Sequence, residues 1–96
     1  RDFTYIDNVI QANLLALSTE EPLCYGEVFN IGAGGRITIG EMSEIIKKEL
    51  NYTGDILYGK NREGDIPHSN ASISKANLLL KYYPKIDFQT GIKKLL

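Results

Sequence analysis

EVFNIGAGGRITIGEM, residues 27–42, joins an apolar run to a glycine-rich turn and then to the start of a helix. The run at residues 27–31 is apolar and carries an aromatic residue, which is typical of a buried β-strand. The glycines that follow it allow a tight turn. Thr38 and Glu41 then have the spacing of a capping box, in which each side chain accepts a hydrogen bond from the other residue's backbone N–H. This stretch therefore predicts a strand, a turn and a helix that reaches about Leu50.

The same reading of the whole chain predicts an alternation of strands and helices. Strands are expected at residues 2–6, 27–31 and 55–58. Helices are expected from Asp7 or Asn8 to Ser18, from Thr38 to about Leu50, from Ser72 or Ser74 to about Tyr82, and from Thr90 to Leu96. A polar loop is expected at residues 61–69. The order βαβαβ-loop-αα places the chain in the α/β class, with residues 1–96 forming a single partial domain.

The first expected helix has a clear apolar pattern. Asn8 and Gln11 resemble a capping box at its start. Ile10, Leu14 and Leu17 recur at the spacing i, i+4, i+7 and are expected to form its apolar stripe.

Composition restricts the class of protein. The chain has 96 residues, of which 43% are hydrophobic and 24% charged, as expected for one small globular unit. It opens on Arg1 without an initiating methionine, so we expect a fragment of a longer protein. Lys and Arg number 11 against 12 Asp and Glu, which gives no basic excess for nucleic acid. No apolar run approaches the roughly 18 residues of a membrane span, and no signal peptide is present. We therefore expect a cytoplasmic protein.

Residues for catalysis, metal binding or cofactor binding are not expected in this chain. Cys24 and His68 are the only cysteine and the only histidine, too few for a typical zinc site, and Cys24 is expected to be a small buried apolar residue. Residues 32–37 imitate the first half of a dinucleotide-binding fingerprint, but Ile37 stands where the third glycine belongs. We interpret them as a turn, with phosphate binding as the alternative.

The segment from Arg62 to Asp65 reads R-E-G-D, and two interpretations are open. It is an ordinary solvated turn, or it binds a nucleotide. In the second case Arg62 would contact phosphate oxygens in a bidentate manner, and Asp65 would accept hydrogen bonds from a ribose diol. Gly64 would let both side chains face one ligand.

Five segments, in the right order, resemble motifs of the extended short-chain dehydrogenases, the family of nucleotide-sugar epimerases and dehydratases. The most similar members are the UDP-N-acetylglucosamine 4-epimerases. The segments are Arg1 to Asp7 (family R-D-F/Y-x-x-V-x-D), Val28 to Gly32 (V-[YF]-N-[IL]-G), Arg62 to Ser69 (R-x-G-D loop), Ser72 to Ala76 (D-x-S-K-A) and Phe88 to Ile92 (F-x-x-G-I). Ser72 departs from the family's aspartate, although serine also caps helices.

The resemblance implies roles for specific residues. Arg1 and Arg62 would bind the nucleotide diphosphate, and Asp65 would hold the ribose hydroxyls of a UDP-sugar. NAD, bound by an N-terminal Rossmann domain that lies outside this chain, would take hydride from C4 of the sugar and return it to the other face. The family's catalytic tyrosine has a lysine four residues later, and none of the six tyrosines here does. The fragment alone is therefore expected to be inactive, and the parent to dimerise through the absent domain.

Ser69 follows the R-x-G-D loop at a position where epimerases confined to plain hexoses carry a tyrosine. A serine leaves room for the 2-acetamido group of UDP-GlcNAc or UDP-GalNAc, whereas a phenol ring would clash with it. The alternative is that Ser69 only caps or solvates the loop. Two other functions stay open for the whole protein: a nucleotide-sugar 4,6-dehydratase or reductase of the same family, and a non-catalytic α/β interaction module.

Overall fold

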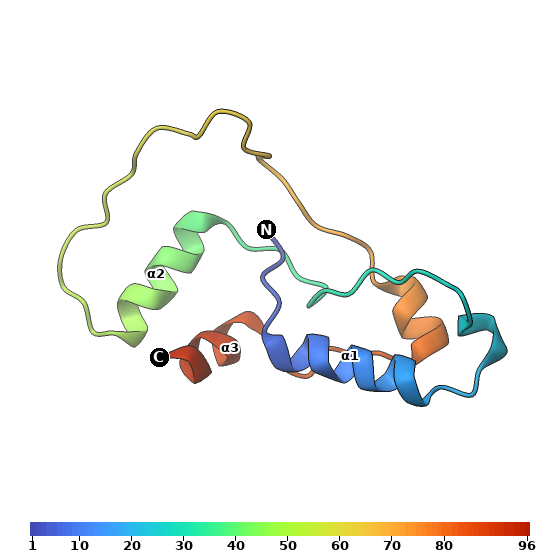
Figure 1. Cartoon of the computed structure of the whole chain (residues 1–96). Coiled ribbons are helices and arrows are strands. Elements are labelled where there is room, and N and C mark those ends of the chain that lie inside the picture. Colours follow the sequence, from blue (N-terminus) through green and yellow to red (C-terminus); the bar gives the residue numbers. More distant parts are fainter.

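The computed structural model describes all 96 residues as helices joined by extended segments (Figure 1). The elements are α1 (Ile6–Ser18), the 3₁₀ turn η1 (Pro22–Cys24), α2 (Ile39–Glu49), the π-helical turn η2 (Ala76–Leu80) and α3 (Phe88–Leu95). There is no β-strand, so the βαβαβ order expected from the sequence is wrong in its strands.

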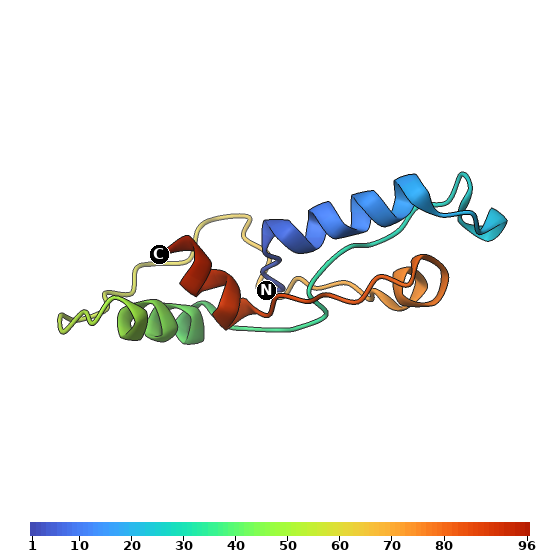
Figure 2. The same ribbon diagram turned by 90° about the horizontal axis from the view of Figure 1, so that it is seen from below.

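The helices form two groups at opposite ends of a long, flat molecule. α2 and α3 lie at one end, and α1 with η1 and η2 at the other (Figure 2). The chain measures 53 × 30 × 15 Å and has a radius of gyration of 16.4 Å. A compact domain of this length would have a radius of gyration of about 12.5 Å. Only 8 of the 96 residues are buried. The chain therefore encloses a small core and leaves most of its apolar side chains exposed.

The three segments expected to be β-strands have no neighbouring strand to pair with in this chain. Residues 27–31 run as an extended segment, but none of the backbone N–H groups from Val28 to Ile31 has a hydrogen-bond acceptor. Residues 55–58 likewise form no backbone ladder. Residues 2–5 are extended too, and the helix α1 begins directly after them. A β-strand exists only as part of a ladder, because its N–H and C=O groups bond to a neighbouring strand.

α1 buries a different face from its apolar stripe. Asn8 and Ala12 are buried, whereas Ile10, Leu14 and Leu17 are 48%, 59% and 84% exposed. The stripe exists as predicted, but nothing within this chain covers it.

Asn8 does not cap α1, since the helix begins after Tyr5 with no side-chain cap. Instead its side chain binds the segment before α3. The amide Nδ2 donates to the carbonyl of Ile86 at 2.7 Å, and Oδ1 accepts from the N–H groups of Lys85 and Ile86 at 3.1 Å each. The most buried polar side chain of the protein therefore joins α1 to a segment almost eighty residues away.

The core lies where α1 meets η2. It consists of Ala12, Cys24, Ala76, Leu80 and Tyr82. Burial of Cys24 confirms the expectation for this residue. The Tyr82 hydroxyl donates to the carbonyl of Gly32 at 2.6 Å, and burial, followed by the nearby charge of Asp2, raises the pKa of this phenol. Tyr82 thus fixes the glycine-rich turn on the core.

Two helix starts are capped by side chains. At α2 the predicted capping box is present: Glu41 N–H donates to Thr38 Oγ1 at 3.0 Å, and Thr38 N–H donates to Glu41 Oε2 at 2.7 Å. At α3 the cap is Asp87, which accepts from Thr90 N–H at 2.7 Å, so this helix starts earlier than expected.

The helix expected to end near Tyr82 is short. Its helical turn begins at Ser74, continues as η2 and ends at Lys81, which adopts a left-handed conformation with φ of 57°.

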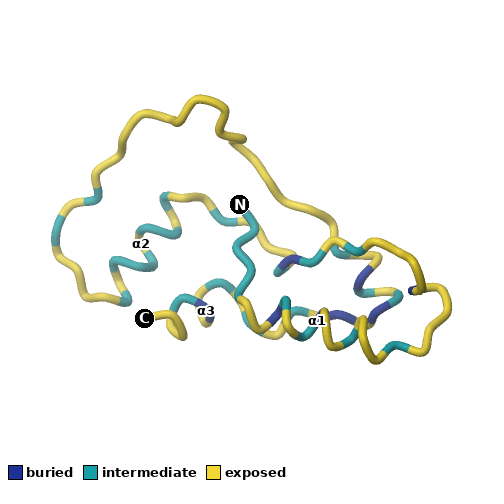
Figure 3. Tube along the Cα trace, in the orientation of Figure 1, coloured by how far each residue is buried: buried dark blue, intermediate teal, exposed yellow.

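An exposed loop connects α2 to η2. Nearly all of residues 51–75 are exposed, and the loop encloses one side of α2 (Figure 3). No helix in the chain combines the length and apolar character needed to cross a lipid bilayer.

Candidate functional site

A hollow of about 720 Å³ lies between the start of the chain, the residues that lead into α2, and the loop. It is lined by Arg1, Arg36, Ile37, Thr38, Ile39, Glu41, Asn61, Asp65, Ile66, Pro67 and His68. Charged and polar groups from three segments therefore face one space.

Arg1 is held at this hollow by backbone pairing. Its backbone nitrogen donates to the carbonyl of Ile37 at 2.8 Å, and Ile37 N–H donates to the carbonyl of Arg1 at 2.9 Å. The pair fixes the first residues beside the start of α2, and it leaves the guanidinium group of Arg1 free to face the loop.

The glycine-rich turn is folded around Asp2. The Asp2 carboxylate accepts hydrogen bonds from the N–H groups of Ala33 at 3.3 Å and Gly34 at 3.1 Å. Gly34 has φ of 74°, a left-handed conformation that favours glycine, and a side chain at Gly32 would collide with the Asp2 carboxylate. Because a carboxylate already occupies these N–H groups, they are not available to a phosphate. The interpretation of this segment as a turn fits the structure better than phosphate binding does.

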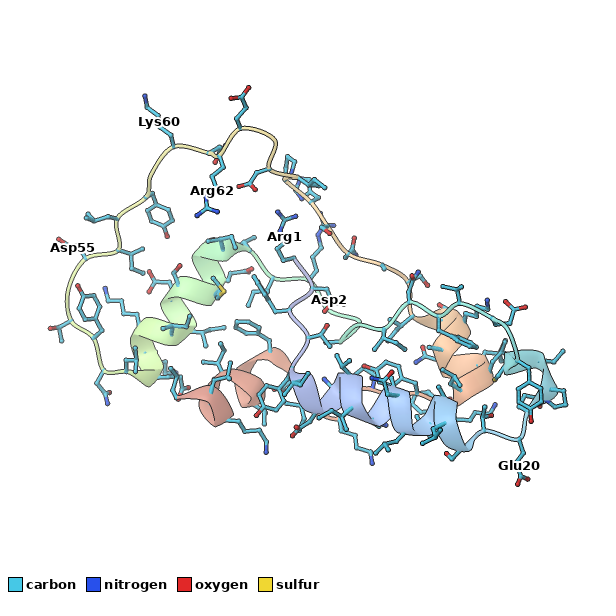
Figure 4. All side chains as sticks on the ribbon, viewed as in Figure 1. Arg1, Asp2, Glu20, Asp55, Lys60 and Arg62 are labelled. Carbon is cyan, nitrogen blue, oxygen red and sulfur yellow. The ribbon has the colours of Figure 1, made fainter.

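The R-E-G-D segment forms a tight turn on the far side of the hollow. Asp65 N–H donates to the carbonyl of Arg62 at 3.2 Å, and Gly64 between them has φ of 81°. Figure 4 shows the Arg62 side chain pointing inward from the loop, toward the space that Arg1 faces from the opposite side. Lys60, on the same loop, points outward (Figure 4).

The structure places two of the four site residues predicted from the sequence, Arg1 and Asp65, in the lining of one hollow, and Arg62 lies outside this lining. The Arg62 side chain points toward the hollow. Ser69 is exposed and lies outside the lining. Neither Arg1 nor Arg62 forms an ion pair within the chain, where the salt bridges are Lys75–Glu27 and Lys93–Glu49.

Sequence reasoning missed two residues of the hollow. Arg36 and His68 meet across it, with Arg36 Nη2 at 3.0 Å from His68 Nδ1. The two residues are 32 positions apart, and no motif linked them. Only the fold, which sets the loop against the residues before α2, could reveal the pair.

The hollow has the chemistry of an anion site. Guanidinium groups bind phosphate oxygens in a bidentate geometry, and a carboxylate such as Asp65 accepts hydrogen bonds from hydroxyl groups. Both types of group face the same space from opposite segments. The arrangement suits a ligand that carries phosphates and hydroxyls together.

Comparison with known proteins links this sequence and fold to nucleotide-sugar 4-epimerases of the short-chain dehydrogenase type, whose C-terminal part the chain matches. The crystal structure of UDP-glucose 4-epimerase with UDP-glucose from Thermotoga maritima superposes with a TM-score of 0.87 at 34% identity, over 97% of this chain and 29% of that one.

Sequence relatives give the same result. A Methanocaldococcus jannaschii protein provisionally named a UDP-glucose 4-epimerase is 38% identical over 99% of this chain and 29% of its own length. UDP-glucuronate 4-epimerase 4 of Arabidopsis thaliana is 34% identical over 98% of this chain and 24% of its own length. No family model matches the sequence. The chain therefore spans less than a third of the length of these relatives.

Proposed function

We propose that this chain is the substrate-binding part of a nucleotide-sugar 4-epimerase. One observation carries the proposal: Arg1 and Asp65, far apart in the sequence, line one hollow, and Arg62 points toward it from the loop. The likeness in sequence and fold to an epimerase crystallised with UDP-glucose supports it. Arg1 and Arg62 bind the diphosphate, and Asp65 accepts hydrogen bonds from the ribose hydroxyls.

NAD, in this proposal, supplies the hydride acceptor for C4 of the sugar. The residues of this chain do not suit the cofactor, because the N–H groups of Ala33 and Gly34 in the glycine-rich turn are already bonded to Asp2. We therefore assign NAD to another part of the full-length protein. This chain binds and orients the substrate. Binding of the diphosphate and ribose fixes the sugar relative to the reacting groups, and such positioning accelerates reactions strongly.

The exposed apolar surface supports the proposal that another part of the protein packs against this chain. Ile10, Leu14 and Leu17 of α1 lie uncovered, and the extended residues 28–31 have unpaired backbone N–H groups. The chain forms 39 backbone hydrogen bonds, well below the roughly 65 expected of a complete domain of its length. We propose that residues 1–96 are one partial domain, completed by the NAD-binding domain.

The proposed activity is tested on the full-length protein with NAD and UDP-glucose. We expect UDP-galactose to accumulate until the two sugars reach equilibrium, as followed by chromatography of the nucleotide sugars. A 4-keto-6-deoxy product would instead identify a dehydratase of the same family. A protein that binds no UDP-sugar at all would be the non-catalytic interaction module, and the proposal would be wrong.

The substrate is proposed to include N-acetylhexosamines, through the small side chain at position 69. Ser69 is exposed and follows the R-E-G-D turn by four residues. Replacing Ser69 with tyrosine is expected to reduce turnover of UDP-GlcNAc at least about tenfold relative to that of UDP-glucose, because a fixed bulky wall discriminates against the acetamido group. The ratio of the two kcat/KM values measures this effect. Ser69→Ala is the matched control, and an equal loss for both sugars in Ser69→Tyr would refute the steric role.

A further inference from the structure

Arg36 is the second guanidinium group in the lining of the hollow, with Arg1. It comes from the residues that lead into α2, and it lines the hollow together with Arg1 and Asp65. Its side chain is solvent-exposed on this face rather than packed in the core. Glu41 and Asp65 are the carboxylates in the lining, and neither forms an ion pair with Arg1 or Arg36. An anion placed beside these two guanidinium groups gains from both positive charges.

Two of the acidic residues near Arg36 are already engaged elsewhere. Glu41 accepts a hydrogen bond from Thr38 N–H at 2.7 Å in the capping box, and hydrogen bonds from the Thr38 backbone and side chain lower the pKa of this carboxyl. Asp2 accepts from the glycine-rich turn. No carboxylate lies within salt-bridge distance of Arg36, since the ion pairs of the chain involve only Lys75 and Lys93. No carboxylate therefore neutralises the Arg36 guanidinium group by direct contact.

His68 orients this group from the opposite side of the hollow. Arg36 Nη2 lies 3.0 Å from His68 Nδ1. A guanidinium group only donates hydrogen bonds, so in this contact Nδ1 is the acceptor. One N–H of Arg36 Nη2 donates to the His68 imidazole, and the other N–H groups of the guanidinium group remain available to a ligand. The contact also holds the loop against the residues before α2.

We propose that Arg36 is a third binding residue for the diphosphate and that His68 is its positioning residue. This inference rests on the proposed function and extends it to Arg36 and His68, to which the resemblance assigns no role. The diphosphate would lie among three guanidinium groups, with Arg36 supplying charge-assisted hydrogen bonds from the α2 side. A ligand without phosphates would gain nothing from Arg36.

The test compares Arg36→Gln with the unaltered full-length protein by isothermal titration calorimetry, using UDP-glucose, UDP and uridine. Loss of one charge-assisted contact is expected to raise the Kd of UDP-glucose and UDP about tenfold and to leave that of uridine within about twofold. Arg36→Lys keeps the charge but not the planar guanidinium group. Its Kd for UDP-glucose is expected to lie between those of the unaltered protein and Arg36→Gln. Lys48→Gln removes an exposed positive charge on the outside of α2 and is the matched control.

The role of His68 is read from a double-mutant cycle. His68→Gln keeps an acceptor and is expected to preserve affinity, whereas His68→Phe is expected to weaken UDP-glucose binding severalfold. Combined with Arg36→Gln, His68→Phe should add almost nothing, because both changes remove the same contact. Fully additive effects would mean that His68 does not act through Arg36.

The failure of this inference is distinguishable from that of the proposed function. If Arg62→Ala weakens UDP-glucose binding while Arg36→Gln behaves like Lys48→Gln, the inference about Arg36 alone is wrong. If the unaltered protein does not bind UDP-glucose, both are wrong. An equal effect of Arg36→Gln on uridine and UDP would also overturn the inference, since it would place Arg36 away from the phosphates.

Discussion

Replacing Asn8 with leucine in the full-length protein is expected to lower the free energy of unfolding by about 2 kcal/mol. The Asn8 amide is 1% exposed and satisfies three backbone groups, the N–H groups of Lys85 and Ile86 and the carbonyl of Ile86. Leucine has a similar volume but no polar atoms. All three groups would lose their partners at once. Because Lys85 is exposed and Ile86 half-buried, water can replace part of the lost bonding, so the cost per group stays below the roughly 1–3 kcal/mol of a fully buried group.

Urea unfolding followed by circular dichroism measures the effect of this change. The control is Asn13→Leu, which makes the same substitution at an exposed position of α1. It should change the stability by no more than about 0.5 kcal/mol, as surface substitutions usually do. Equal stabilities of the two variants would contradict the role given to Asn8 in joining α1 to the segment before α3.

Replacing Arg62 with alanine is expected to raise the Kd of UDP-glucose about 10- to 100-fold. A hydrogen bond to a charged group contributes about 1.5–3 kcal/mol, and each 1.4 kcal/mol changes Kd tenfold. The Arg62 side chain points inward from the loop, toward the side of Arg1 (Figure 4), and it forms no salt bridge in this chain. Calorimetric titration of the full-length protein measures the change.

Lys60→Ala is the matched control for Arg62→Ala. Lys60 lies on the same loop and carries the same charge, but its side chain points outward (Figure 4). It is expected to change Kd less than twofold, mainly through the weak, salt-screened attraction of a distant charge. If the two variants bound UDP-glucose equally well, the diphosphate assignment of Arg62 would be refuted.

Local signals predicted the helices better than the strands. The capping box of Thr38 and Glu41 depends on residues three positions apart, so the sequence suffices to identify it, and the structure contains it. The alternating pattern of a strand reports only that a segment suits a sheet. Whether a ladder forms depends on a neighbour, and residues 27–31 have none within this chain. Likewise the stripe of Ile10, Leu14 and Leu17 was visible in the sequence, but what would cover it was not.

Some residues of the candidate site could be predicted from the sequence and others could not. Arg1, Arg62 and Asp65 could be proposed from motifs, because each motif is a short run of residues with a recognisable chemistry. Arg36 and His68 carry no such signal, and only the backbone pairing of Arg1 with Ile37 and the course of the loop bring them together. Their placement is a tertiary property of the chain.

The long exposed loop after α2 has a consequence for energetics. It carries Arg62 and Asp65, yet the contact between His68 and Arg36 is its one side-chain hydrogen bond to the rest of the site. A ligand that bridges Arg1 and Arg62 must immobilise this loop. Fixing the backbone of one residue costs roughly 1–2 kcal/mol in conformational entropy. The affinity for such a ligand therefore depends on the rigidity of the free loop as well as on the strength of the arginine contacts. Substitutions that make residues 51–60 more rigid would tighten binding without contacting the ligand.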